Sequence, residues 1–220
     1  MGGYVFYWSI VWDSMPDLHF GAWVTLQIAE LSIVFGTLLG MPMAVARQKG
    51  AGADYRLATA WVEISRNTPV LFQVYMMYFG LGALGVNISS YASVLIALTF
   101  NNAGYLAEIF RGGLAAVPAQ QLSAARSLGM TRLQGFLHVI FPQVFRIVFF
   151  SFVTQCVWAM LNTSLGMLVG LRELSGAAQA AQSVTFRTFE FFIVTAAIYY
   201  VMAKMIEIAA QIVFARALRV

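Results

Sequence analysis

The chain has 220 residues, of which 60% are hydrophobic and only 10% are charged, and its mean hydropathy is +0.77. Soluble domains carry about 25% charged residues, so this composition excludes an ordinary soluble protein and predicts an all-α integral membrane protein. The formal net charge of +4 comes from basic residues that cluster beside the apolar segments, which indicates membrane topology rather than nucleic-acid binding. A single cysteine excludes an internal disulfide. The sequence contains no Cys/His cluster that would suggest a metal site.

Residues 1–19 are predicted to form a periplasmic, interfacial segment. They contain Asp13 and Asp17 and have no basic n-region, so we expect no cleavable signal peptide. Aromatic side chains favour the boundary between lipid and water. The segment carries five of them: Tyr4, Phe6, Tyr7, Trp8 and Trp12.

A membrane-spanning helix needs roughly 20 mostly apolar residues. Five segments are predicted to span the membrane: residues 20–46, 57–81, 91–110, 142–169 and 189–214. We expect them to form one transmembrane domain over residues 20–216, because the sequence between them offers no separate soluble domain and no internal repeat.

Basic residues predict the orientation of these segments. They follow the first, third and fifth segments: Arg47, Lys49, Arg56, the stretch 111–142, Arg216 and Arg219. Lys and Arg are retained on the cytoplasmic side. The N-terminus is therefore predicted to be periplasmic and the C-terminus cytoplasmic.

The second segment contains charged residues at predicted membrane depth. Glu63 and Arg66 are three positions apart, so they share a helix face and can pair. Asn67 and Thr68 follow, and Pro69 biases Thr68 away from helical dihedrals. Irregular backbone within a membrane is tolerated where it is buried or lines a wet cavity, so we expect a bend near a transport pathway. A structural proline kink with a snorkelling Arg66 is the alternative.

The fourth segment also carries polar side chains. Asn162, Thr163 and Ser164 lie within its apolar run. They can hydrogen-bond a polar ligand, or they can join neighbouring helices, and the pattern leaves both interpretations open. In the fifth segment, Lys204 and Glu207 are expected to pair because they are three positions apart.

The stretch 111–142 is basic, lacks acidic residues and lies between the third and fourth segments. Its apolar spacing predicts a short helix from Pro118 to Leu128, a corner at Gly129, and a second short helix that meets Pro142. Gly129 can adopt the left-handed conformation that ends helices. We interpret this stretch as a docking surface for a motor subunit. An ordinary cytoplasmic loop lying on lipid headgroups is the alternative.

Catalytic patterns are missing from the sequence, which contains neither a plausible Ser/His/Asp set nor the ATP-binding pattern GxxxxGK[ST]. The chain is therefore predicted not to be an enzyme, and transport through it must take energy from an ion gradient or another subunit. One alternative is an ion-coupled secondary transporter or channel for a small polar solute, in which Glu63, Arg66 and Glu108 relay ions. A third hypothesis is that the chain is a membrane enzyme or a structural membrane subunit.

Four patterns, in order, resemble a known family. The stretch EAA-x3-G-x9-I-x-L-P corresponds to Ser123-Ala124-Ala125, Gly129, Val139, Phe141 and Pro142. The pattern AYxAExxRGG and its downstream Gln correspond to Gly104-Tyr105-Leu106-Ala107-Glu108, Arg111-Gly112-Gly113 and Gln121. The third pattern lies in the second segment and comprises Trp61, Glu63, Arg66-Asn67-Thr68-Pro69, Leu71 and Gln73. The fourth comprises Asn162-Thr163-Ser164-Leu165 with Glu173-Leu174.

On these patterns, the chain resembles the inner-membrane permease subunits of bacterial ABC importers for polar amino acids, the histidine/glutamine/arginine/glutamate group. Its departures from the family include Ser123 in place of Glu, Gln120 in place of Gly, and Leu161 in place of Lys. A degenerate loop of this kind suggests one of two unlike, homologous halves of a heterodimer.

The resemblance implies a multi-pass protein of the bacterial inner membrane, with alternating access driven by two separate ATP-binding subunits. Those subunits would carry the ATP and Mg, and this chain would bind no cofactor or metal. A second permease subunit, a periplasmic substrate-binding protein, a polar amino acid and membrane lipid would be its other partners. The residues implied to couple to the ATPase are Ser123, Ala124, Ala125, Arg126, Leu128 and Gly129. The candidate substrate pathway comprises Glu63, Arg66, Asn67, Thr68, Asn162, Thr163 and Ser164.

Overall fold

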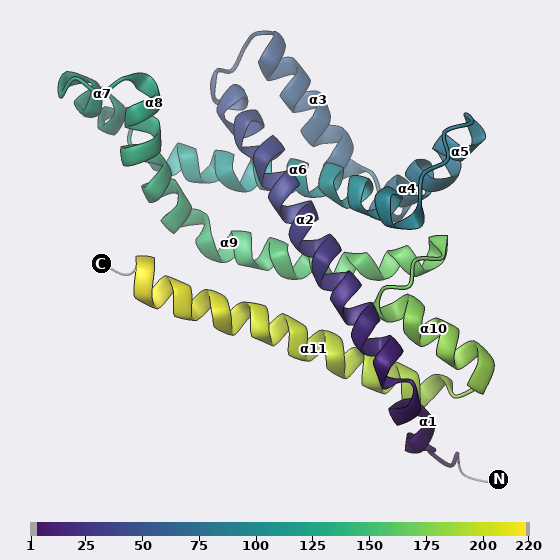
Figure 1. The fold of residues 1–220 in the computed structure, drawn as a ribbon. Helices are drawn as coiled ribbons and strands as arrows, with labels where there is room; N and C mark the ends of the chain where they lie inside the picture. Colours follow the sequence, from purple (N-terminus) through teal and green to yellow (C-terminus); the bar gives the residue numbers. More distant parts are fainter. Residues whose placement is uncertain (1–3, 219–220) are drawn as a thin grey trace. The chain divides into compact units, whose positions relative to one another are not determined.

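The computed structural model describes residues 4–218, and every regular element in that range is helical (Figure 1). The α-helices are α1 (Trp8–Asp13), α2 (Met15–Gln48), α3 (Ala53–Asn67), α4 (Val70–Tyr75), α5 (Leu81–Ala83), α6 (Ser90–Ala116), α7 (Gln120–Ser127), α8 (Arg132–Gly135), α9 (Phe141–Asn162), α10 (Leu174–Thr185) and α11 (Thr188–Val213). Three π-helical turns are η1 (Met76–Gly80), η2 (Phe136–Ile140) and η4 (Phe214–Leu218), and a 3₁₀ helix is η3 (Thr163–Val169).

Within the described range, four helical stretches are long and apolar enough to cross a membrane. They are Met15–Gln48, Ser90–Ala116, Arg132–Val169 and Thr188–Arg216, with mean hydropathies between 1.2 and 1.8. They contain the first, third, fourth and fifth segments predicted from the sequence. The prediction of an all-α integral membrane protein is therefore confirmed.

The predicted second span, residues 57–81, was wrong as a single helix. Helix α3 ends at Asn67, and Thr68 is extended, with φ −111° and ψ 140°. Pro69 then begins α4, which continues through η1 into α5. The break follows from Pro69, because its ring excludes helical dihedrals at Thr68 and its nitrogen cannot donate to the α3 ladder. The expected bend is thus a complete interruption.

Two further expectations needed correction. The short helix expected to meet Pro142 instead continues through that residue, because α8, η2 and α9 form one helical stretch. The wider π turn of η2 lies immediately before Pro142, where an α turn would be crowded by the proline ring. The stretch between the fourth and fifth predicted segments, for which no helix was predicted, contains α10, whose Leu174, Ala177 and Ala178 are buried.

The chain divides into two compact units. Unit 1 comprises Met1–Ser32, Pro69–Leu98 and Val157–Ile208, and unit 2 comprises Ile33–Thr68, Thr99–Cys156 and Ala209–Val220. Unit 1 has two apolar clusters, one around Leu18, Met160 and Phe191 and the other around Ile28 and Leu98. Burial of apolar side chains of this size stabilises each cluster by about 1.5–3 kcal/mol per residue.

Unit 2 is held together by close helix contacts at small residues. At Gly40 of α2, an added Cβ would lie 2.8 Å from the Ala103 carbonyl oxygen of α6. Gly104 of α6 lies against Ser65 of α3, and Gly113 of α6 lies against Val148 of α9. Small residues allow helix backbones to approach closely within a membrane, where packing rather than water exclusion drives association.

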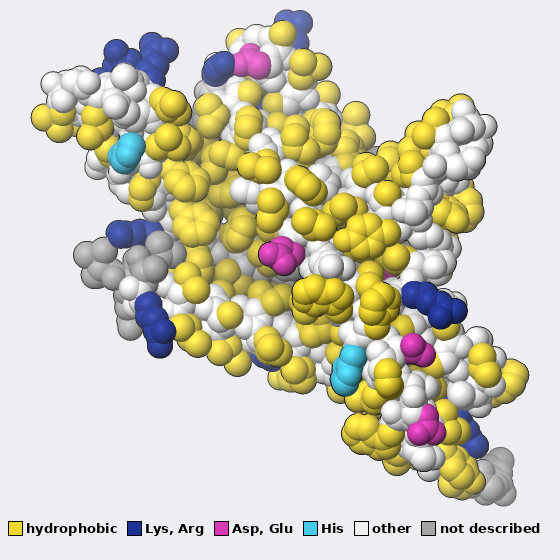
Figure 2. Space-filling model, in the orientation of Figure 1, with side chains coloured by type: hydrophobic (Ala, Val, Ile, Leu, Met, Phe, Trp, Pro, Cys, Tyr) yellow, Lys and Arg dark blue, Asp and Glu magenta, His cyan; other side chains and the backbone are white. Residues whose placement is uncertain are grey.

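Hydrophobic side chains cover most of the visible surface of the protein (Figure 2). Exposed apolar residues recur along α2, α9 and α11, including Phe35, Leu38, Phe150 and Ile193. An apolar surface of this extent requires lipid or protein partners. This agrees with the membrane-length helices.

Candidate functional site

Helices α7 and α8 form a compact hairpin, here called the α7–α8 hairpin (Gln120–Gly135). Gly129 has φ +85°, in the left-handed region. Its N–H donates to the Arg126 carbonyl at 3.0 Å, and the Met130 N–H donates to the Ala125 carbonyl at 3.2 Å. This pair of bonds is a Schellman motif, which satisfies the last carbonyls of α7. The corner predicted at Gly129 is therefore present, with α7 starting two residues after Pro118.

The second half of the hairpin begins with a capping box. The Gln134 N–H donates to Thr131 Oγ1 at 3.2 Å, and the Thr131 N–H donates to Gln134 Oε1 at 2.9 Å. At Gly135, an added Cβ would lie 3.0 Å from Leu122 Cδ1 and 3.4 Å from Ala125 Cβ. Because α8 approaches α7 at this glycine, the hairpin holds its shape through its own contacts.

The hairpin presents a mixed apolar and basic surface. Leu128 is 81% exposed and Leu133 is 66% exposed. A cavity of about 270 Å³ lies beside the corner, lined by Leu128, Gly129, Met130, Gln134 and His138. Lys and Arg side chains gather over this end of the protein (Figure 2). Of the six predicted coupling residues, only Ala125 is buried, while Ser123, Ala124, Arg126, Leu128 and Gly129 are exposed.

Helix α3 exposes a polar face near its C-terminal end. Glu63, Arg66 and Asn67 are exposed on it. The Asn101 amide of α6 donates to the Ser65 carbonyl at 2.9 Å.

The ion pair that the spacing of Glu63 and Arg66 allows is not formed between these two side chains. Glu63 Oε2 instead accepts a hydrogen bond from Asn67 Nδ2 at 2.8 Å. The Arg66 guanidinium lies over the Tyr105 ring, 5.3 Å from its centroid, and 3.8 Å from a carboxylate oxygen of Glu108. Arg66 therefore has its partners on another helix, α6, whereas Glu63 is hydrogen-bonded within α3.

Three arginines converge on Glu108. We call Arg47, Arg66, Arg111 and Glu108 the arginine cluster. Arg111 donates to Glu108 through Nε, at 3.2 Å to both oxygens, and through Nη2 at 2.9 Å to Oε2. Arg47 forms an ion pair with the other side of the carboxylate. Glu108 therefore faces three positive charges, and the carboxylate of Glu63 also acts electrostatically on Arg47. Three guanidinium groups and two carboxylates leave a surplus of one positive charge.

Unit 1 contains a different polar centre around Glu173, which is completely buried. Its carboxylate accepts hydrogen bonds from the Ser175 N–H at 3.0 Å, the Gly176 N–H at 2.8 Å and the Tyr199 hydroxyl at 2.8 Å. Thr25 Oγ1 donates at 3.3 Å. Burial raises the pKa of Glu173 above its usual value, and these donors oppose that shift. The residue caps α10 and connects it to α2 and α11.

A cavity of about 570 Å³ in unit 1 includes one predicted pathway residue, Ser164. Its other lining residues are mainly apolar or carry hydroxyl groups: Leu161, Ser175, Phe192, Thr195, Ala196, Tyr199, Tyr200 and Ala203. The buried Thr195 hydroxyl has no hydrogen-bond partner among the described residues. The other two predicted residues of this segment lie at the change from α9 to η3, where Thr163 Oγ1 donates to the Met160 carbonyl at 2.8 Å.

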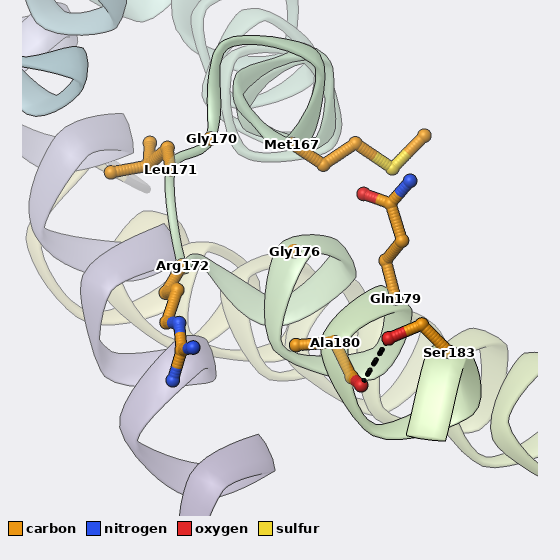
Figure 3. Close-up of a pocket in the computed structure, with 8 residues that line it drawn as sticks. All are labelled: Met167, Gly170, Leu171, Arg172, Gly176, Gln179, Ala180 and Ser183. Carbon is orange, nitrogen blue, oxygen red and sulfur yellow. Dashed lines mark hydrogen bonds between the residues drawn. The ribbon is translucent and has the colours of Figure 1, made fainter. Parts of the chain in front are cut away.

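A second pocket of unit 1, of about 350 Å³, lies between η3 and α10 (Figure 3). Met167 and Gln179 approach each other on one side, and Arg172 lies on the other side (Figure 3). Ser183 Oγ donates to the Ala180 carbonyl at 2.8 Å. Arg172 is exposed and makes no hydrogen bond or ion pair with the residues that the structure describes.

Residues 36–219 match the family model described as "Binding-protein-dependent transport system inner membrane component". The chain belongs to this family. The match covers α3, α6, the α7–α8 hairpin, α9 and α11, so it includes Glu108, Glu173 and the hairpin. The protein is therefore an inner-membrane transport permease, and the resemblance drawn from the four sequence patterns is confirmed.

Individual relatives of this permease are amino acid transporters. It is 35% identical to the octopine transport system permease protein OccM of Rhizobium meliloti, over 87% of this chain and 82% of that one. It is 32% identical to the probable glutamine ABC transporter permease protein GlnM of Bacillus subtilis (strain 168), over 91% and 93%. A crystal structure of an amino acid ABC transporter with histidines matches 97% of this chain and 100% of its own, with TM-score 0.86 and 31% identity.

Sequence reasoning about this permease missed part of the polar architecture. The spacing of Glu108 and Arg111 is a visible signal for their pair, but nothing local brings Arg47 to the same carboxylate. Glu173 appeared in the sequence only as part of a family pattern. Its contacts with Thr25 and Tyr199 span 148 and 26 positions, so they arise from tertiary packing.

Proposed function

We propose that this permease is the pore-forming subunit of an ATP-driven, binding-protein-dependent importer for a polar amino acid. Two separate ATP-binding subunits, which carry ATP and Mg, would supply the energy. A second, homologous permease subunit would complete the pore as a heterodimer. The N-terminus would be periplasmic and the C-terminus cytoplasmic, as the distribution of basic residues indicates.

The α7–α8 hairpin is the observation that supports this proposal most directly. It is rigid, because the Schellman motif, the capping box and the contact at Gly135 fix its shape. It also exposes the side chains of Leu128 and Leu133. Contact of such apolar side chains with water is unfavourable, which suits a surface that binds a partner. A rigid element with an apolar tip can transmit a push from an ATPase subunit to the helices that continue from it, α6 and α9.

The predicted pathway residues are proposed to contact the transported amino acid, and some of them lie in unit 2 and others in unit 1. In unit 2 these are Glu63, Arg66 and Asn67 on the exposed face of α3, with Thr68 at its end. In unit 1 they are Ser164 and the hydroxyl groups of the 570 Å³ cavity. Asn162 and Thr163 would shape the helix end beside that cavity. A periplasmic binding protein would deliver the amino acid to the surface that includes residues 82–90 and 171–188.

The test of this function replaces Leu128 by Ser in a tagged chain, which is purified from its native membranes in mild detergent. We expect the unmodified chain to recover an ATP-binding subunit and a second permease. Leu128→Ser is expected to reduce recovery of the ATP-binding subunit about tenfold or more, since burying a leucine at an interface contributes about 1.5–3 kcal/mol. Mass spectrometry of the recovered proteins gives the measurement.

Leu84→Ser is the matched control, because Leu84 is 79% exposed but lies in the segment proposed to face the periplasm. It should leave recovery of the ATP-binding subunit unchanged. Unchanged recovery and normal ATP-driven uptake with Leu128→Ser would contradict docking at the hairpin. Uptake that follows an ion gradient without ATP would instead support the secondary-transporter alternative.

A further inference from the structure

Two arginines of unit 2 have no countercharge among the residues that the structure describes. Arg146 lies in α9, and Arg216 lies in η4, which continues from α11. Both side chains are exposed, and neither makes a hydrogen bond or an ion pair with a described residue. Glu207, the acidic residue closest to Arg216 in the sequence, is paired with Lys204 at 2.6 Å. Two positive charges of this unit are therefore left for a partner outside the chain.

The sequence puts both arginines at the ends of apolar runs. Residues 147–169 carry no charged side chain, and a membrane crossing needs roughly 20 mostly apolar residues, so Arg146 directly precedes a span. Arg216 closes the membrane-length stretch Thr188–Arg216. Arginine side chains at such boundaries keep their stems on apolar surface and extend the guanidinium group toward the lipid headgroups. We therefore expect both guanidinium groups at the level of the headgroups.

Aromatic contacts bring these two boundaries together. The ring centroid of Phe214 lies 5.3 Å from that of Phe149 and 4.9 Å from that of Phe150. The end of α11 and the start of α9 run in opposite directions (Figure 1), so Arg146 and Arg216 lie on the same side of this contact. With a rise of 1.5 Å per residue, Arg146 lies about 6 Å and Arg216 about 3 Å from it along the helix axes.

The surface on the other side of the arginines is apolar. Ile147 and Phe150 of α9, and Ile212 and Val213 of α11, are each between 47% and 54% exposed. Phe150 follows Arg146 by four positions, so the two share a face of α9. This surface therefore has a cationic end and an apolar strip. A phospholipid has the complementary form, because its phosphate accepts charge-assisted hydrogen bonds from arginine and its acyl chains cover apolar side chains.

We propose that Arg146 and Arg216 bind the phosphate of one anionic phospholipid, such as phosphatidylglycerol, whose acyl chains lie along the apolar strip of α9 and α11. Basic pockets between transmembrane helices bind anionic headgroups in this way. A zwitterionic lipid carries its own positive charge, so two arginines favour an anionic one. The bound headgroup bridges the start of α9 and the end of α11. None of these residues belongs to the predicted pathway or to the α7–α8 hairpin, so the site does not depend on the proposed function.

The experiment uses the complete complex in nanodiscs that contain phosphatidylcholine and phosphatidylglycerol in equal amounts. One of the two lipids carries a photoreactive diazirine on an acyl chain. After irradiation and pepsin digestion, mass spectrometry gives the ratio of phosphatidylglycerol to phosphatidylcholine labelling on peptides that span residues 147–150 and 212–214. Arg146→Gln and Arg216→Gln should each lower this ratio about fivefold, the effect of one basic residue beside an anionic headgroup.

The crossed effects test whether the two arginines hold the same lipid. Arg216→Gln should lower the ratio on the peptide of α9, and Arg146→Gln should lower it on the peptide of α11. A change confined to the helix that carries the substitution would overturn a shared site. Arg146→Lys keeps the charge and should retain more of the ratio than Arg146→Gln. Equal losses in these two variants would show that the arginine shapes the helix surface instead of binding a headgroup.

Arg56→Gln is the matched control, because it removes the same charge from an exposed position that is also predicted to be cytoplasmic. It lowers any general attraction between the protein and anionic lipid but should leave the labelling ratio at both peptides unchanged. A loss as large as that in Arg146→Gln would overturn the specific site, since net charge alone would then explain the preference.

The same labelling experiment distinguishes the other occupants of this surface. If neither lipid labels the two peptides, protein covers the surface, and a second permease subunit replaces lipid as its partner. Inorganic phosphate, added at constant ionic strength, should leave the ratio unchanged, because the acyl chains contribute to lipid binding. Loss of the phosphatidylglycerol preference in phosphate would show that the arginines bind a free anion, and would overturn the lipid site.

Discussion

Glu173 and Glu108 are both glutamates at the centre of polar clusters, but their partners differ in kind. Glu173 in unit 1 is completely buried and accepts hydrogen bonds from two backbone N–H groups and two hydroxyl groups. Glu108 in unit 2 keeps 20% of its side chain exposed and faces three arginines. The donors around Glu173 are neutral, whereas the donors around Glu108 are positively charged arginine side chains.

This difference indicates different roles. Short neutral donors fixed to helix ends hold one geometry, because each is placed by backbone or by a short side chain. Long arginine side chains around one carboxylate can exchange partners at little cost when the helices that carry them move. We therefore expect the Glu173 centre to stabilise the fold and the arginine cluster to adjust during transport.

The largest expected effect is the loss of stability in Glu173→Ala. Removing the carboxylate leaves buried donors unsatisfied, and each costs about 1–3 kcal/mol, so we expect a total loss of about 4 kcal/mol. Thermal unfolding in detergent, followed by intrinsic tryptophan fluorescence, measures it. Tyr199→Phe removes one donor and is the smaller control, at about 1 kcal/mol. A loss of stability no greater for Glu173→Ala than for Tyr199→Phe would show that the centre is not a structural anchor.

Glu108→Gln should have a smaller effect that depends on salt. It leaves Arg47 without a full countercharge, and we expect a loss of about 2 kcal/mol, because Glu108 is partly exposed. Raising the ionic strength from about 0.1 M to about 1 M should reduce this loss, since salt screens the repulsion between the remaining arginines. The loss in Glu173→Ala should not change with salt. Identical salt dependence in the two variants would remove the distinction between the centres.

The smallest expected effects concern two glycines of α6, the helix that carries Glu108. Replacing each by Ala tests how closely the neighbouring helices pack against α6 at that position. Gly104→Ala would place Cβ 1.8 Å from Ser65 Oγ, so we expect a loss of about 1–2 kcal/mol. Gly112→Ala meets no atom within 4 Å and should stabilise the same helix by about 0.5–1 kcal/mol. Unfolding temperatures that shift in the same direction would show that α3 does not pack tightly on α6.

Local features of the hairpin were accessible from sequence because they depend on neighbouring residues. Gly129 predicted a left-handed corner, and its φ of +85° confirms it. The spacing of Lys204 and Glu207 predicted their pair, which is present at 2.6 Å. Contacts of this kind lie within one or two helical turns, so residue type and spacing largely determine them.

The spacing of Glu63 and Arg66 makes an ion pair available, but the structure does not form it. Asn67 lies four positions after Glu63 and takes the carboxylate. Arg66 turns toward Tyr105 and Glu108 on α6. A spacing rule states which contacts are geometrically available, whereas the neighbouring helix decides which one has the lower free energy.

Sequence alone predicted the membrane class, the extent of the main apolar helices, a departure from helical dihedrals near Pro69 and the hairpin corner. These follow from hydropathy, from the missing proline N–H and from glycine's freedom at positive φ. Only the tertiary structure decided that Glu108 gathers Arg47, Arg66 and Arg111, and that Glu173 joins α2, α10 and α11. Those contacts join residues from separate helices, and helix packing, rather than spacing along the chain, brings them together.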